Sequence, residues 1–264
     1  MMRRQDGFTV PELLIMMVVT TILTVLVLSF TISYWGAAAR LENDSSTLVS
    51  RLNAGDALRD QLNVASGLIS QNSISDTNAG SVDQTAGPGY WTLLHAVPGT
   101  VTMPSSGTIA PVFYYQAPST DASRNFIMNG SQPYSDEFVL YLDGSSSTLK
   151  LRRLINPSAA GDRLTTTCPP AQATATCPAD KVLAENVSSV DTRYFSRSGN
   201  TINYQSQVEL DQYGNPVVPT VYIGPDFPSV EVVELTVHLF QKSMVGGAAN
   251  TSNETIVRVA LRNG

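Results

Sequence analysis

An uninterrupted apolar stretch near the N-terminus constrains this chain more than any other feature. It runs from Phe8 to Trp35, and Glu12 is its only charged residue. At a rise of 1.5 Å per residue, about 28 residues form about 42 Å of helix, which exceeds the ~30 Å hydrocarbon core of a bilayer. The sequence therefore predicts one membrane-spanning helix.

Basic residues are distributed unevenly around this stretch. Arg3 and Arg4 come just before it, and the next basic residue is Arg40. The positive-inside rule then predicts a cytoplasmic N-terminus and a head on the other side of the membrane. A conventional secretory signal has a shorter apolar region followed by a small-residue cleavage site. Residues 37–39 resemble such a site, but the apolar run before them is about twice the usual length.

Glu12 requires compensation if it lies within a membrane. An ionised carboxylate at the centre of a membrane helix costs on the order of 2.5–3.5 kcal/mol on insertion scales. In one interpretation, Glu12 lies at the cytoplasmic headgroup level, where the start of a helix favours negative charge. In the other, a cation from another chain pairs with it. The residues alone leave both interpretations open.

Gly7, Phe8, Thr9 and Glu12, followed by the apolar run, resemble the processing motif of type IV prepilins and pseudopilins. The resemblance implies that the prepilin peptidase, a membrane aspartyl protease, cuts after Gly7 and methylates the new N-terminal amine of Phe8. It also implies that Glu12 pairs with the N-terminal amine of a neighbouring subunit. The cation of the second interpretation would then come from that subunit.

Two positions depart from the common pattern of that family. Pro11 directly precedes the glutamate, but in the first helical turn its missing N–H would have been unpaired in any case. Ser29 lies in the region where many pilins carry a helix-breaking proline. The sequence leaves open whether the helix partly melts on assembly.

The helical pattern continues beyond the apolar run. Small and apolar residues recur at steps of three and four between Leu41 and Ile69, with charged residues on the opposite face. This predicts one helix from about Thr9 to about Asn63, with its outer half laid against a sheet. The alternative is two helices broken near Gly36. Gln71 to Gly89 has no apolar period and predicts a loop between stalk and head.

From Tyr90 onward, short β-branched and aromatic runs alternate with turn residues, which is typical of strands. Two hairpins are predicted, Glu137–Leu142 with Thr148–Leu154 and Val232–Phe240 with Thr255–Leu261. Weaker strands are expected at Tyr90–Ala96, Val112–Gln116, Val187–Phe195 and Thr201–Leu210. The predicted class is α+β, a long N-terminal helix packed on an antiparallel β-sheet head.

The head is similar to the large minor pilins of the J-like pseudopilin and W-like group. The similarity rests on the segments AENVSSVDTRYFSRSG, HLFQK and VRVALRN. It implies the type IV pilin fold in five parts. These are a leader peptide (1–7), a transmembrane helix and filament core (8–35), an amphipathic stalk (36–69), a linker (70–89) and an extracytoplasmic head (90–264).

Cys168 and Cys177 lie in one loop-like stretch, each followed by proline. A metal site would need further Cys or His residues nearby, and His95 and His238 are distant in sequence. A local disulfide is the favoured interpretation, and two unpaired thiols are the alternative. Because a disulfide persists only in an oxidising compartment, the bond would place this loop outside the cytoplasm.

The charge balance and motif content bear on function. The chain has 16 Lys and Arg against 22 Asp and Glu, a net charge of −6, without a basic cluster, which argues against nucleic-acid binding. His95 and His238 each stand alone in sequence, and no phosphate or metal motif occurs. We therefore expect no enzymatic activity and no cofactor. Asp211 with Asp191 or Asp226 could hold calcium, although a solvated turn is the favoured interpretation.

The resemblance implies a minor pilin or pseudopilin, a structural subunit near the tip or in the shaft of a type IV pilus-like filament. Its expected partners are other pilin subunits, the prepilin peptidase, the inner-membrane pilus assembly platform and the membrane. It would lie first in the inner membrane and then in an extracellular or periplasmic filament. Alternatives are an adhesin or DNA-capture subunit using exposed aromatics such as Tyr114 and Tyr115, and a single-pass anchored extracytoplasmic protein. The residues leave open whether the system serves a retractile pilus, secretion or DNA uptake.

Overall fold

In the computed structural model, the described residues fall into eight ranges along the chain. They are 9–78, 89–91, 99–162, 164–202, 205–207, 221–223, 227–240 and 252–261. The chain divides into two compact units, with the boundary in the N-terminal helix between Leu48 and Val49.

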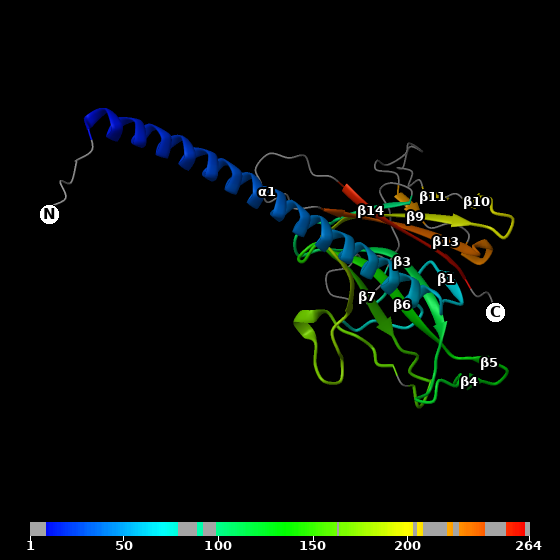
Figure 1. Cartoon of the computed structure of the whole chain (residues 1–264). Helices are drawn as coiled ribbons and strands as arrows, with labels where there is room; N and C mark the ends of the chain where they lie inside the picture. The colour runs from blue at the N-terminus through cyan, green and yellow to red at the C-terminus, as the bar shows by residue number, and fades with distance from the viewer. Residues whose placement is uncertain are drawn as a thin grey trace, which may run out of the picture. The chain divides into compact units, whose positions relative to one another are not determined.

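The helix α1 runs without a break from Val10 to Leu62 (Figure 1). This confirms the prediction of one helix from about Thr9 to about Asn63, and the alternative break near Gly36 is wrong. Its first part, Val10–Ala39, contains an 18-residue window with a mean hydropathy of 2.7, and no residue of that window is buried. Length and composition therefore suit either a single-pass membrane anchor or a signal sequence.

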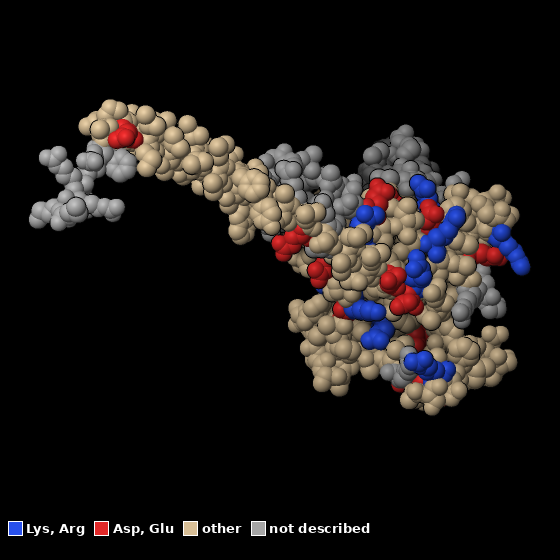
Figure 2. All heavy atoms as spheres, in the orientation of Figure 1, with Lys and Arg blue, Asp and Glu red and all other residues tan. Residues whose placement is uncertain are grey.

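Four threonines in the apolar part of α1 form hydrogen bonds within their own helix. The hydroxyls of Thr20, Thr21, Thr24 and Thr31 each donate to the backbone carbonyl four residues earlier, at 2.7–2.8 Å. A bilayer core offers no water to these groups, so such internal bonds lower the cost of a threonine there. In Figure 2, the surface of this part of the helix carries no charged group apart from one acidic group near its start.

The second unit contains a five-stranded antiparallel sheet. Its spatial order is β1 (Gly67–Ile69), β3 (Ile109–Pro118), β6 (Ser135–Asp143), β7 (Thr148–Leu154) and β8 (Lys181–Glu185). Strands β6 and β7 form the first predicted hairpin. The predicted strand at 112–116 lies within β3. Both predictions are confirmed.

A second antiparallel sheet has the order β10 (Thr201–Ile202), β9 (Val187–Phe195), β13 (Val232–Phe240) and β14 (Ser252–Ala260), and β2 (Thr100–Thr102) also pairs with β9. The second predicted hairpin is confirmed as β13 and β14, and the strand at 187–195 as β9. Most of the expected strand at 90–96 lies outside the described residues. The expected strand at 201–210 is described only as β10 and β11 (Gln205–Gln207), and β11 pairs with β12 (Val221–Ile223).

Shorter elements complete the described part of the head. Strands β4 (Met128–Asn129) and β5 (Gln132–Pro133) pair as a short antiparallel hairpin. Single turns of 3₁₀-helix occur at Pro170–Gln172 and Phe227–Ser229.

The outer part of α1 packs within the second unit. Ala54, Leu58 and Leu62 are buried at intervals of one helical turn and contribute to the core. At Gly55, an added Cβ would lie 3.3 Å from the Thr255 Cγ2 atom of β14. The helix thus approaches the sheet closely where it lacks a side chain. The predicted α+β class, with the helix laid against a sheet, is confirmed.

Tyr114 and Tyr115 correct the sequence analysis, which expected exposed aromatic rings. They are 0% and 1% exposed. Strand β3 lies between β1 and β6, and both of its faces are covered, so neighbouring residues with opposite orientations are buried alike. Tyr115 stacks on Phe138 of the adjacent strand, with 4.9 Å between ring centroids.

Candidate functional site

The start of α1 holds the acidic residue that the sequence analysis singles out. Glu12 Oε2 accepts hydrogen bonds from the backbone N–H of Thr9 at 3.0 Å and from its hydroxyl at 2.9 Å. Thr9 precedes the first helical residue, so Thr9-Val10-Pro11-Glu12 has the spacing of a capping box. The carboxylate therefore stabilises the first turn of its own helix. Gly7 and Phe8 lie outside the described residues.

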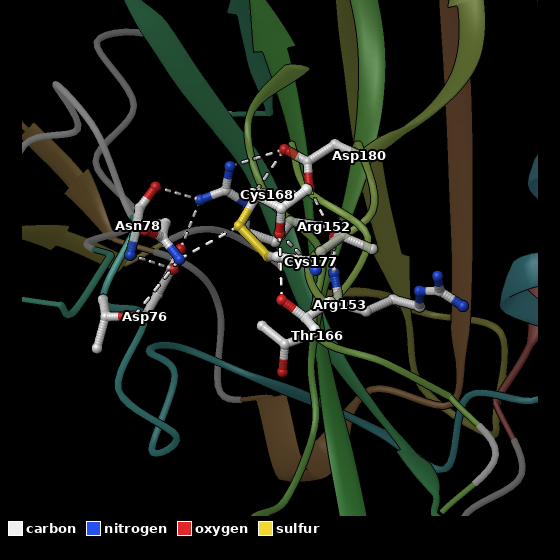
Figure 3. Close-up of a disulfide and its surroundings, with 12 residues drawn as sticks. Asp76, Asn78, Arg152, Arg153, Thr166, Cys168, Cys177 and Asp180 are labelled. Carbon is white, nitrogen blue, oxygen red and sulfur yellow. Dashed lines mark hydrogen bonds and ion pairs between the residues drawn. A yellow bond between two sulfur atoms is a disulfide. The ribbon is translucent and has the colours of Figure 1, made fainter. Parts of the chain in front are cut away.

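The two cysteines form the predicted disulfide, Cys168–Cys177, and the alternative of unpaired thiols is wrong (Figure 3). The backbone around it is also bonded, because the N–H of Cys168 donates to the carbonyl of Pro178 at 2.9 Å. The N–H of Asp180 donates to the carbonyl of Cys168 at 2.8 Å. The disulfide ring and these backbone bonds thus fix the position of Asp180 at the end of the loop.

Asp180 is one of two carboxylates that bind a buried arginine. Arg152 projects from β7, and its Nη2 atom lies 2.7 Å from Asp180 Oδ2. Its Nη1 atom lies 2.7 Å from Asp76 Oδ2 and donates to the carbonyl of Asn78, also at 2.7 Å (Figure 3). Burial alone would lower the pKa of Arg152, but the bonds and charges of Asp180 and Asp76 raise it above its ordinary value. The Arg152 guanidinium therefore remains protonated.

Two aromatic residues line this arginine. The guanidinium carbon lies 5.3 Å from the ring centroid of Trp91 and 5.9 Å from that of Tyr141, within the range of cation–π attraction. Each ring also donates to one of the carboxylates. The Trp91 Nε1–H bonds Asp76 at 2.8 Å, and the Tyr141 hydroxyl bonds Asp180 at 2.6 Å. Burial and the charge of Asp180 raise the pKa of Tyr141, so its hydroxyl remains a donor.

The segment that follows α1 is held to the sheet by polar contacts. Glu137 of β6 accepts bonds from the backbone N–H groups of Ser73 and Ile74, both at 2.9 Å. The amide of Asn72 accepts from the N–H of Trp91 at 2.7 Å. The sequence predicts a loop from Gln71 to Gly89 but does not indicate these anchors. It does not indicate the role of Arg152 either, for which the local signal is a charged residue among the leucines of a strand.

His238 stands alone in sequence, but the fold brings two carboxylates to it. Its Nε2 atom lies 2.8 Å from Asp191 Oδ2, and its Nδ1 atom lies 3.4 Å from Glu254 Oε1. Asp191 Oδ1 also accepts a bond from the Thr100 hydroxyl at 2.7 Å. Asp191 lies on β9 and Glu254 on β14, the two strands that flank the strand of His238, β13. The three side chains therefore form a ladder across neighbouring strands. His95 lies outside the described residues.

No group of three or more His, Cys, Asp or Glu side chains among the described residues is arranged to hold a metal ion. Asp211 and Asp226, two of the three candidate calcium ligands, lie outside those residues. That the chain has no enzymatic activity and no cofactor stays a prediction.

Comparisons with known proteins give no relative for this chain. No protein-family model matches it, and no curated protein or solved structure is significantly similar to it. The candidate site is therefore defined by two features of the structure alone. They are the capped acidic start of an exposed apolar helix and a buried ionic network that ties the segment after the helix to the head.

Proposed function

We propose that this chain is a minor pilin or pseudopilin, a structural subunit of a type IV pilus-like filament. The observation that carries the proposal is that the apolar part of α1 leaves its side chains exposed, while the same helix continues into the core of the head. An apolar surface of this size requires cover. Lipid supplies it for the single subunit, and the helices of other subunits supply it in the filament.

Glu12 has two successive partners in this proposal. In the single subunit its carboxylate binds Thr9, as observed. After cleavage behind Gly7, the methylated amine of Phe8 on a neighbouring subunit replaces that contact and fixes the register between subunits. The capping bond compensates the carboxylate before assembly, and an opposite charge compensates it afterwards.

The proposed partners follow from this path. The prepilin peptidase cleaves and methylates the subunit, the inner-membrane assembly platform passes it on, and other pilin subunits receive its helix. The subunit lies first in the inner membrane and then in an extracellular or periplasmic filament. The disulfide supports the location of the head, because such a bond persists in an oxidising compartment. The adhesin or DNA-capture alternative loses its argument from Tyr114 and Tyr115, since both rings are buried.

Mass spectrometry of the N-terminal peptide, taken from native membranes or sheared filaments, tests the proposal directly. We expect an N-methylated Phe8 as the first residue. An intact Met1 in protein from its native host would contradict the proposal and leave a single-pass anchored protein as the alternative.

A further inference from the structure

A pair of acidic side chains lies apart from the arginine network. Asp136 is the second residue of β6 and is 0% exposed. Asp162 lies in the turn that follows β7, and its backbone forms an isolated bridge with Asp121. The pair thus joins the beginning of β6 to residues 156–164, which lead to the disulfide loop.

Each carboxyl group has one oxygen that is well bonded. Asp136 Oδ1 accepts from the Ser119 hydroxyl at 2.7 Å and from the backbone N–H of Asn156 at 3.1 Å. Asp162 Oδ1 accepts from the backbone N–H of Leu164 at 2.7 Å. These donors hold both carboxyl groups in place.

The second oxygens are different. Oδ2 of Asp136 and Oδ2 of Asp162 are both buried and have no donor among the described residues. The two carboxyl groups lie within hydrogen-bonding reach of each other. Two ionised carboxylates cannot satisfy one another, because both only accept, and their charges repel in a buried site. A proton between them removes both penalties.

Other charged groups surround the pair. Burial raises the pKa of Asp136 to about 6, and the neighbouring Asp162 acts in the same direction, against the bonds from Ser119 and Asn156. Arg153 of β7 interacts electrostatically with both carboxyl groups. Arg163, next to Asp162 in sequence, lies outside the described residues.

We infer that Asp136 and Asp162 share one proton, and that this proton acts as a pH-sensitive latch between the start of β6 and residues 156–164. Protonated, the pair forms a charge-assisted O–H···O⁻ bond, which is among the strong hydrogen bonds of proteins. Deprotonated, it becomes two buried like charges, and the turn that carries Asp162 is released. The inference rests on the pair alone and does not depend on the proposed function.

The direction of the pH effect follows from proton linkage. The folded chain binds the proton more tightly than the unfolded chain, since the pKa of Asp136 rises from 3.8 to about 6 on folding. The stabilisation from the latch is therefore fully present below about pH 4 and is lost as the pH rises through about 6.

The Asp136→Asn variant tests the latch. Its amide NH₂ can donate to Asp162 Oδ2 at every pH, while its carbonyl still accepts from Ser119 and Asn156. For the full chain in detergent micelles, we expect the wild-type Tm to fall between about pH 4 and 7 and this fall to be absent in the variant. At pH 5, the infrared carbonyl band of protonated carboxylic acid should be weaker in the variant than in the wild type by the contribution of this one carboxyl group.

Asp121→Asn is the matched control. Asp121 is partly exposed, and the backbone N–H of Asn125 lowers the pKa of its carboxyl group, so it titrates below the window of interest. This variant should keep the wild-type fall in Tm and the infrared band. If Asp136→Asn fails to fold, Asp162→Asn serves instead, because its amide can donate to Asp136 Oδ2.

Three results would overturn the inference. The first is an unchanged pH dependence of Tm in a folded Asp136→Asn or Asp162→Asn variant. The second is a protonated-acid band at pH 5 that is as strong in the Asp136→Asn variant as in the wild type. The third is a rise in wild-type Tm on adding calcium chloride at pH 8 that Asp136→Asn lacks, because the pair would then bind a cation in place of a proton.

Discussion

The Arg152 guanidinium lies 2.7 Å from the Asp180 carboxylate, and both side chains are fully buried. Asp180 closely follows Cys177, so the disulfide loop delivers the counterion of the arginine. The same guanidinium binds Asp76, in the segment that leaves α1. One cation therefore joins three parts of the chain that are distant in sequence.

Replacing Asp180 with Asn should destabilise the head strongly. Removing one partner of a buried ion pair leaves an uncompensated charge and costs about 3–5 kcal/mol. We expect a loss of this size in the free energy of unfolding, measured by urea denaturation in detergent. Glu234→Gln is the control, because its partners Arg193 and Arg258 are largely exposed and such pairs contribute about 0–1 kcal/mol. Equal losses in both variants would contradict the assigned role of Arg152.

Removal of the disulfide should cost less than removal of Asp180. A ring this small contributes roughly 2–3 kcal/mol in the chain-entropy model. We expect the Cys168→Ser, Cys177→Ser double variant to lose about that amount in the same assay. If the disulfide acts by positioning Asp180, adding Asp180→Asn should cost less in this background than in the wild type. Strict additivity of the two losses would show that the disulfide does not position the counterion.

Gly55 and Gly36 provide a matched pair of helix positions. Leucine at Gly55 would collide with β14, because even a Cβ would lie 3.3 Å from Thr255 Cγ2. We expect Gly55→Leu to destabilise the head by about 1–3 kcal/mol, the usual cost of overpacking. A Cβ at Gly36 meets no atom within 4 Å, so Gly36→Leu should leave the unfolding of the head unchanged. A Gly55→Leu variant as stable as wild type would contradict the observed packing.

The helix and the main strands could be predicted because their signals are local. Steps of three and four and runs of β-branched residues are visible within a short window. The capping bond of Glu12 could also have been found, since Thr-x-x-Glu is itself a capping-box signature.

The arginine network could not be predicted in this way. Arg152 takes its partners from 76 and 28 residues away, and no local pattern indicates which distant carboxylates approach it. For the same reason the burial of Tyr114 and Tyr115 was missed. It depends on β3 being an interior strand with cover on both faces, which is a property of the assembled sheet.

Substituting Glu12 tests the proposed filament role. Without the carboxylate, the helix still has its apolar length, so membrane insertion should be retained. Incorporation into filaments should be lost in Glu12→Ala, because no anion remains to bind the neighbouring Phe8 amine. Immunoblots of sheared filament and membrane fractions from the native host measure both outcomes.

Two further variants separate charge from capping. Glu12→Gln keeps an acceptor for Thr9 but removes the charge, so it should also fail to assemble if the amine of Phe8 is the partner. Glu42→Ala removes a charge from an exposed position later in the same helix and should assemble normally. Normal assembly of Glu12→Gln would show that capping alone accounts for the residue, and the pairing between subunits would have to be abandoned.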